Sequence, residues 1–230
     1  MKRRTAIALI TAGAVVVVGA VVALAGPVFY RDVIVGAPDP TPTVATGATA
    51  GATVEPAEVQ GAWTVSDGSY AGYRVDEVLN GTDVTVDGRT EKVTGTVTID
   101  DAAVTAASFT VDVDSIATDQ GSRDSYFRNT ALQTFRYPTA TFTLTKPVAA
   151  ASSPQVGVKQ TVTATGELTL HGQTRTVSVP MDLLFDGETA QVAGSIPITF
   201  ADYGVQAPNL GFVKVEDHGF VEFSLVLTEK

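Results

Sequence analysis

Residues 161–174 read TVTATGELTLHGQT, and this stretch decides the fold class of the chain. Small or apolar residues occupy every second position from residue 162 to residue 170, and threonine or glutamate fills the positions between them. Successive side chains of a β-strand point to opposite faces, so the alternation predicts a strand with one buried face and one wet face. His171-Gly172 then predicts a tight turn into a second strand.

The same period of two recurs through the chain after Trp63, in residues 93–99, 109–113, 177–185, 192–200 and 221–227. Turn sequences separate many of these runs, as at Asn80-Gly81, Asp87-Gly88, Asp100-Asp101 and Asp186-Gly187. Many short strands joined by hairpins predict an all-β domain. We expect an antiparallel meander that closes as an extended barrel of about eight strands or stacks as a sandwich.

One segment departs from this pattern, because Phe127, Ala131 and Phe135 follow one another at a spacing of four residues. This spacing places the three side chains on one face of a helix. We therefore expect a short helical insertion at residues 123–132. Arg123 and Asp124 are expected to form a local ion pair that fixes it.

The interior of an eight-stranded barrel is either filled by side chains or holds one small ligand. Small residues take several of the inward positions of the predicted strands, namely Gly95, Ala164, Gly166 and Gly194. Beside large aromatic residues they predict unfilled volume, and an empty apolar cavity costs roughly 24 cal/mol per Å³. If that volume exists, an apolar ligand is expected to fill it.

The N-terminus predicts a membrane anchor. Lys2, Arg3 and Arg4 precede an uncharged run over residues 5–30, which as a helix would reach about 39 Å against a hydrocarbon core of about 30 Å. We expect residues 1–31 to be a signal anchor with a cytoplasmic N-terminus, so that the chain is a single-pass protein of the cell membrane with an extracytoplasmic C-terminal domain. The small residues around Leu24 leave open a signal peptide that is cleaved.

Residues 32–60 are rich in proline, threonine and alanine, and they predict a linker to a domain at residues 61–230. As a flexible coil the linker would span about 30 Å, and about 90 Å if fully extended. The chain has 15 basic and 25 acidic residues, and four of each precede residue 61, so the domain carries a formal charge of −10. That charge argues against nucleic acid as a partner. The chain has no cysteine, so no disulfide can form.

Two separated blocks carry a family signature. The first contains Ser115-Ile116-Ala117-Thr118, Arg123-Asp124-Ser125-Tyr126-Phe127 and the run over residues 135–142, and the second covers residues 166–180. Over residues 63–230 the chain resembles the YceI-like family of bacterial lipid-binding proteins. That resemblance implies a lipocalin-like antiparallel β-barrel that encloses a long isoprenoid lipid, a quinone or a similar lipid, without catalysis or another cofactor. The chain lacks a histidine that many members carry near residues 73–77.

The resemblance and the alternation together suggest which residues would surround the lipid. Candidates for the chamber wall are Phe109, Phe142, Leu168, Leu170, Met181, Phe200 and Phe223. Candidates for a cap from the helical insertion are Tyr126, Phe127, Leu132 and Phe135. The alternative is that Phe127 and Phe135 only fill the core, because an apolar stripe at helical spacing is commonly core.

Two rival functions stay open. A ligand-free module of the envelope, with a role in interaction or stress response, would have a filled interior. A hydrolase would use Ser115, Asp124 and His171, but the chain has no Gly-x-Ser-x-Gly elbow. His171 is expected instead to be a turn residue that bonds to backbone. No metal is expected at His218, because its acidic neighbours would point to opposite faces of a strand. The identity of the lipid and the existence of a homodimer are left open.

Overall fold

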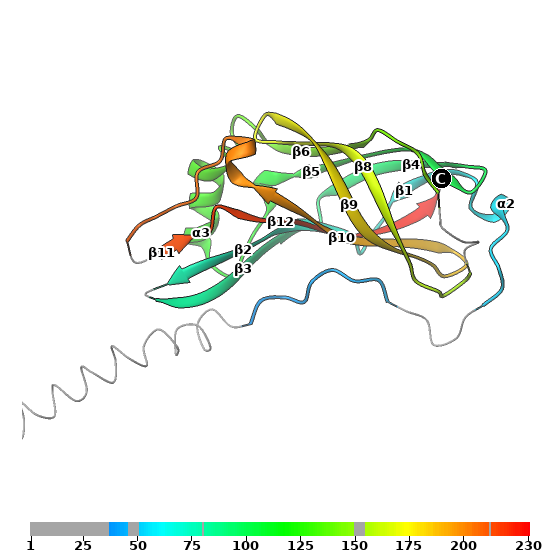
Figure 1. Cartoon of the computed structure of the whole chain (residues 1–230), viewed down its shortest axis with the longest axis horizontal. Helices are drawn as coiled ribbons and strands as arrows, with labels where there is room; N and C mark the ends of the chain where they lie inside the picture. The colour runs from blue at the N-terminus through cyan, green and yellow to red at the C-terminus, as the bar shows by residue number, and fades with distance from the viewer. Residues whose placement is uncertain (1–36, 46–50, 80, 150–154, 212) are drawn as a thin grey trace, which may run out of the picture.

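Eight strands form a closed antiparallel barrel in the computed structural model, which describes residues 37–45, 51–79, 81–149, 155–211 and 213–230 (Figure 1). The barrel closes where the first of these strands pairs with the last, at Trp63 and Glu229. In spatial order the strands are β1 (Gly61–Val65), β4 (Val93–Asp100), β5 (Ala103–Asp112), β6 (Thr139–Leu144), β8 (Gln160–Leu170), β9 (Gln173–Phe185), β10 (Thr189–Thr199) and β12 (His218–Glu229). This confirms the predicted barrel.

A smaller group of strands extends one end of the barrel. β2 (Tyr70–Leu79) pairs with β12 beside β1, and it carries β3 (Thr82–Thr90) and β11 (Val213–Val215). β3 returns to the barrel through a bridge between Arg89 and Ala117. The remaining short elements are β7 (Val148–Ala149), which pairs with β5, and α2 (Pro56–Val59), which precedes β1.

The predicted helical insertion is present between β5 and β6. It comprises η2 (Val113–Ser115), α3 (Gly121–Tyr126) and a π-helical turn, η3 (Phe127–Ala131), and it lies at the end of the barrel that β2 and β11 also occupy (Figure 1). The expectation that Phe135 shares a helical face with Phe127 and Ala131 was wrong, and the residue is 80% exposed. The helix ends before this residue, and Gln133 takes a positive φ of 47° that breaks the four-residue spacing.

The alternation predicted around residues 161–174 is confirmed in the β8–β9 hairpin. Val162, Ala164, Leu168 and Leu170 are buried, and His171 takes a positive φ of 49° at the turn. The expectation that glycines leave volume unfilled does not hold at these sites. A Cβ added to Gly95, Gly166 or Gly194 would meet the ring of Phe109, Phe142 or Phe223 within 3 Å. The rings lie across the glycines and fill the space.

Residues 37–45, which we call the strap, lie against the outer surface of the barrel (Figure 1). Val44 is buried with Leu184 and Ala193, and the Ala45 amide donates a hydrogen bond to Gln191 Oε1 at 3.2 Å. This part of the predicted linker is therefore docked, unlike the free coil expected from its composition. A segment with the composition of a linker can still dock, because Val44 covers the apolar side chains of Leu184 and Ala193 on the outside of the barrel.

The predicted anchor at residues 1–31 lies outside the described residues. Within the described ranges, each helix falls short of the length and apolar character that a membrane crossing requires.

Candidate ligand-binding site

Two cavities lie inside the barrel. Chamber 1, of about 240 Å³, lies among all eight barrel strands, and Trp63 and Phe185 form part of its wall. Chamber 2, of about 590 Å³, lies at the other end among β2, β11, α3, η3 and η4 (Phe200–Tyr203). Chamber 2 alone is within the size range of small-molecule sites, which is about 300 to 1,000 Å³.

The two chambers share one stretch of wall. Five residues border both cavities, and all five are apolar. One lies on β2 and the other four lie on four different barrel strands: Ala71, Val111, Ala140, Leu168 and Val221. Two of the five are alanines, so little side-chain volume separates the chambers at these points. The two apolar chambers therefore lie next to each other along the barrel, separated by these five side chains.

Ten of the eleven residues proposed from the sequence lie on the walls of these chambers. Phe109, Phe142, Met181 and Phe223 border chamber 1, and Leu168 borders both chambers. The other five border chamber 2: Tyr126, Phe127, Leu132, Leu170 and Phe200. Phe135 borders neither chamber. That any of these residues contacts a ligand stays a prediction.

A carboxylate and a guanidinium interrupt the apolar wall of chamber 2. Glu77 on β2 is buried, with its side chain 9% exposed, and its Oε1 lies 3.8 Å from Arg123 Nη2 on α3. Burial raises the pKa of the Glu77 carboxyl, and the nearby Arg123 charge lowers it in part. Beside this pair, Tyr73 stacks on Phe127 with 4.9 Å between ring centroids, and burial raises the pKa of the Tyr73 hydroxyl.

Sequence reasoning missed Glu77, although a signal was present. The inward face of β2 reads Tyr73, Val75, Glu77 and Leu79, so a carboxylate takes a position where the alternation calls for an apolar residue. The predicted pair between Arg123 and Asp124 was wrong. Consecutive helical residues point in different directions, so Arg123 instead contacts Asp119 at 2.6 Å while Asp124 accepts bonds from the Thr118 amide and hydroxyl.

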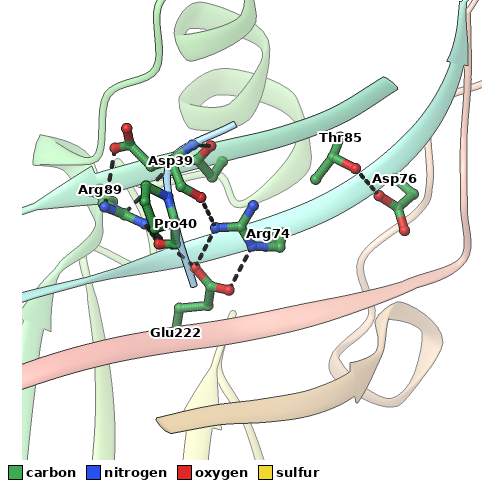
Figure 2. Close-up of polar contacts among 8 residues, drawn as sticks. Asp39, Pro40, Arg74, Asp76, Thr85, Arg89 and Glu222 are labelled. Carbon is green, nitrogen blue, oxygen red and sulfur yellow. Dashed lines mark hydrogen bonds and ion pairs between the residues drawn. The ribbon is translucent and has the colours of Figure 1, made fainter. Parts of the chain in front are cut away.

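A second charged cluster lies on the outer surface, under the strap (Figure 2). Arg74 Nε on β2 donates to Glu222 Oε1 on β12 at 2.6 Å, and Arg74 Nη2 donates to the Asp39 carbonyl at 2.7 Å. Arg89 Nη2 on β3 donates to the Pro40 carbonyl at 2.7 Å, and Arg89 Nη1 lies 3.0 Å from the Asp39 carboxylate. The cluster thus fastens the strap to β2 and β3 and joins β2 to β12.

Comparison with known proteins identifies the family. The model of the YceI-like domain matches residues 63–227, which is most of the chain. The chain belongs to the YceI-like family. This YceI-like domain is 30% identical over 143 residues to a UPF0312 protein of Vibrio cholerae, an alignment that covers 58% of this chain and 72% of that protein.

Solved structures share the fold of this YceI-like domain. BcnA of Burkholderia cenocepacia is 25% identical, with a TM-score of 0.58, and the match covers 70% of this chain and 98% of that chain. A polyisoprenoid binding domain from Saccharophagus degradans, implicated in plant cell wall breakdown, is 20% identical with a TM-score of 0.59, covering 73% and 98% of the two chains.

The three residues of the considered hydrolase are not assembled in this YceI-like domain. Ser115 Oγ lies 2.6 Å from Thr90 Oγ1 and donates to the Asp112 carbonyl at 2.7 Å. Asp124 bonds to Thr118, as described above. His171 Nδ1 lies 3.0 Å from the Tyr203 carbonyl, which confirms the predicted turn histidine bonded to backbone. Each of the three side chains is engaged with a different part of the barrel.

Close to the contact between His171 and Tyr203, two buried polar atoms have no hydrogen-bond partner, namely His171 Nε2 and the Tyr203 hydroxyl. Both atoms are enclosed by protein and have almost no accessible surface. A ligand in chamber 2 therefore cannot contact either atom without a rearrangement of the wall, and we assign neither of them to the site.

The donor atoms of Glu216, Asp217 and His218 lie within 4.8 Å of one another, whereas the sequence predicted that these side chains point to opposite faces of a strand. The prediction was wrong on this point, because Glu216 and Asp217 precede β12 and are not part of a regular strand. The Asp217 and His218 side chains are exposed. Exposed acidic groups commonly gather without binding an ion, and this cluster does not enter the site.

Proposed function

We propose that this protein binds a long-chain isoprenoid or a related amphiphilic lipid inside the barrel, as a carrier or store and without catalysis. The observation that carries the proposal is that two largely apolar chambers lie next to each other along the barrel and share one apolar wall. A hydrocarbon chain gains about 0.8 kcal/mol for each CH₂ that it buries. An empty apolar interior of this size would forfeit packing contacts, so occupancy by such a chain would stabilise the barrel.

The comparisons support the class of ligand. The Saccharophagus degradans domain with the same fold binds polyisoprenoid, as its name states. A polyisoprenoid tail is flexible and apolar, and it suits an interior that is long rather than round. A quinone with an isoprenoid tail would suit the same chambers.

We further propose that the domain is held at the outer face of the cytoplasmic membrane by the anchor predicted at residues 1–31. The docked strap shortens the tether. From Arg31 to the docked Asp39 the chain advances eight residues, which is a reach of at most about 29 Å. The barrel would therefore stay near the bilayer, from which a membrane lipid could enter it.

Organic extraction of the purified full chain, followed by mass spectrometry, tests the function. We expect an isoprenoid lipid in an amount comparable to that of the protein. Trp63, the single tryptophan, borders chamber 1 and is 2% exposed, so its fluorescence should report entry of an added polyprenol. An empty extract together with unchanged Trp63 fluorescence would contradict lipid binding and favour a ligand-free interaction module.

A further inference from the structure

Glu77 occupies a position in chamber 2 that packing alone does not explain. Its neighbours across β2 are Val84 on β3 and Val215 on β11, and both are apolar. The buried carboxylate borders the cavity. A carboxylate in such surroundings costs free energy unless it is paired and hydrogen-bonded.

The described residues leave this carboxylate incompletely paired. Arg123 Nη2 lies 3.8 Å from Glu77 Oε1, which is too long for a hydrogen bond. Arg123 Nη1 is instead engaged with Asp119 at 2.6 Å. Within the described ranges no donor lies at hydrogen-bond distance from the Glu77 carboxylate, whereas Arg123 has further N–H groups that can donate.

The charges around this point select the kind of group that can bind. Arg123 lies against two carboxylates, those of Glu77 and Asp119, and Arg74, which also borders chamber 2, is paired with Glu222. A phosphate or carboxylate group bound beside Glu77 would therefore meet net repulsion. An uncharged hydroxyl can donate to Glu77 and accept from Arg123 at the same time. A carbonyl or an ether can only accept, and it would leave Glu77 unpaired.

The distribution of charged residues between the chambers indicates how a bound lipid would be oriented. Chamber 2 is bordered by Arg74, Glu77 and Arg123, whereas the described wall of chamber 1 contains no charged side chain. A polar head is therefore favoured in chamber 2 and an apolar tail in chamber 1.

We propose that Glu77 and Arg123 form a head-group site in chamber 2 for an uncharged lipid that ends in a hydroxyl, such as a free polyprenol or a prenylated phenol. This inference rests on the proposed function and adds to it the chemistry and the orientation of the ligand. Glu77 accepts the hydroxyl proton in a hydrogen bond, and Arg123 donates to the hydroxyl oxygen.

The test compares three ligands with the same tail: a polyprenol, its methyl ether and its monophosphate. Each is titrated into the full chain in phosphatidylcholine nanodiscs, with Trp63 fluorescence as the readout. We expect the alcohol to bind about tenfold more tightly than the ether or the phosphate, because a hydrogen bond to a charged group is lost with each of them. Equal binding of alcohol and ether, or tightest binding of the phosphate, would overturn the proposed head-group site.

Two variants test whether Glu77 is the residue that causes the preference for the alcohol. Glu77→Gln should reduce the preference for the alcohol to about threefold or less and strengthen phosphate binding, since the charge is removed. Asp76→Asn makes the same change at the adjacent exposed position, where Asp76 accepts from Thr85, and it should preserve the preference. A preference that Glu77→Gln leaves intact would assign the head to another site. If no ligand changes the fluorescence of the native chain, the proposed function itself fails.

Discussion

Arg74 and Glu222 form an ion pair on the outer surface of the barrel, with 2.6 Å between Nε and Oε1, and yet the Glu222 side chain is only 2% exposed. Glu222 faces away from the chambers, which its neighbour Val221 lines, whereas Arg74 also borders chamber 2. The strap accounts for the burial, since Asp39 and Pro40 lie over the pair and accept hydrogen bonds from Arg74 and Arg89 (Figure 2). A segment with the composition of a linker thus completes a buried polar network.

Removal of Arg74 should destabilise the domain. Arg74→Ala leaves the buried Glu222 with Arg89 at 3.9 Å as its remaining cation, and breaking a buried pair costs about 3 kcal/mol. Urea unfolding followed by Trp63 fluorescence measures this loss. Arg136→Ala, at an exposed arginine that stacks on Tyr137, is the control and should have a small effect. A loss below about 1 kcal/mol in Arg74→Ala would mean that the pair behaves as a surface salt bridge.

Docking of the strap should depend on Val44. Val44→Asp buries a charge against Leu184 and Ala193, so we expect the strap to detach while the barrel stays folded. Hydrogen exchange of the Ala45 amide, which bonds to Gln191, should rise toward the rate of an unprotected amide. Thr43→Asp adds the same charge at the exposed neighbouring position and should leave the protection unchanged. Protection that persists in Val44→Asp would refute the role of Val44.

Ligand length should depend on the wall that the two chambers share. Ala140→Phe introduces a ring at this wall, and overpacking of this kind costs about 1 to 3 kcal/mol, so long polyprenols should bind about tenfold more weakly. A short prenol that fits in one chamber should be affected less. Titration of both ligands against Trp63 fluorescence measures the difference. Ala106→Phe, at an exposed position on the neighbouring strand β5 that borders neither chamber, should change neither affinity.

The burial of Glu77 should appear in the pH dependence of stability. The folded state raises the pKa of this carboxyl above its ordinary value of 4.5, so it retains the proton to a higher pH than the unfolded chain does. The free energy of unfolding of the native protein should therefore fall, relative to Glu77→Leu, as the pH rises through the region above that value. Replacing a buried charge with an apolar residue is often neutral or stabilising, so Glu77→Leu should be at least as stable near pH 7.

Urea unfolding of both proteins at about pH 4 and about pH 7 tests this sign. The advantage of Glu77→Leu should shrink at the lower pH, where both the folded and the unfolded native chain carry a protonated Glu77. An advantage that grows at the lower pH would show that the folded state favours the charged carboxylate, as a strong pair with Arg123 would.

The strands were predictable because their signal is local. In β8 the apolar residues Val162, Ala164, Leu168 and Leu170 alternate with polar ones and form the buried face of the strand. Such alternation appears in the sequence whenever one side of a strand faces water and the other faces the core. The helical insertion was found for the same reason. Its end at residue 132 agrees with the structure, but Phe135 was wrongly placed on the same helical face, because the positive φ of Gln133 has no strong signature in the sequence.

Contacts between distant residues were beyond the reach of the sequence. Alternation places Gly95 and Phe109 on inward faces, but it does not show that the ring lies over the glycine and fills the space expected to be empty. Likewise, neighbours in sequence suggested a pair between Arg123 and Asp124, whereas the fold turns Arg123 toward Asp119 and Glu77.

Side-chain periodicity and motifs are properties of the chain alone, so the amino-acid sequence was enough to predict an all-β domain, the place of its helical insertion, its family and ten residues that line its interior. The two adjacent chambers, the position of Glu77 on the larger one and the cover of the strap over Glu222 became visible only in the folded protein. The physical reason is that cavity volume, burial of charge and docking depend on which surfaces meet across strands far apart in sequence.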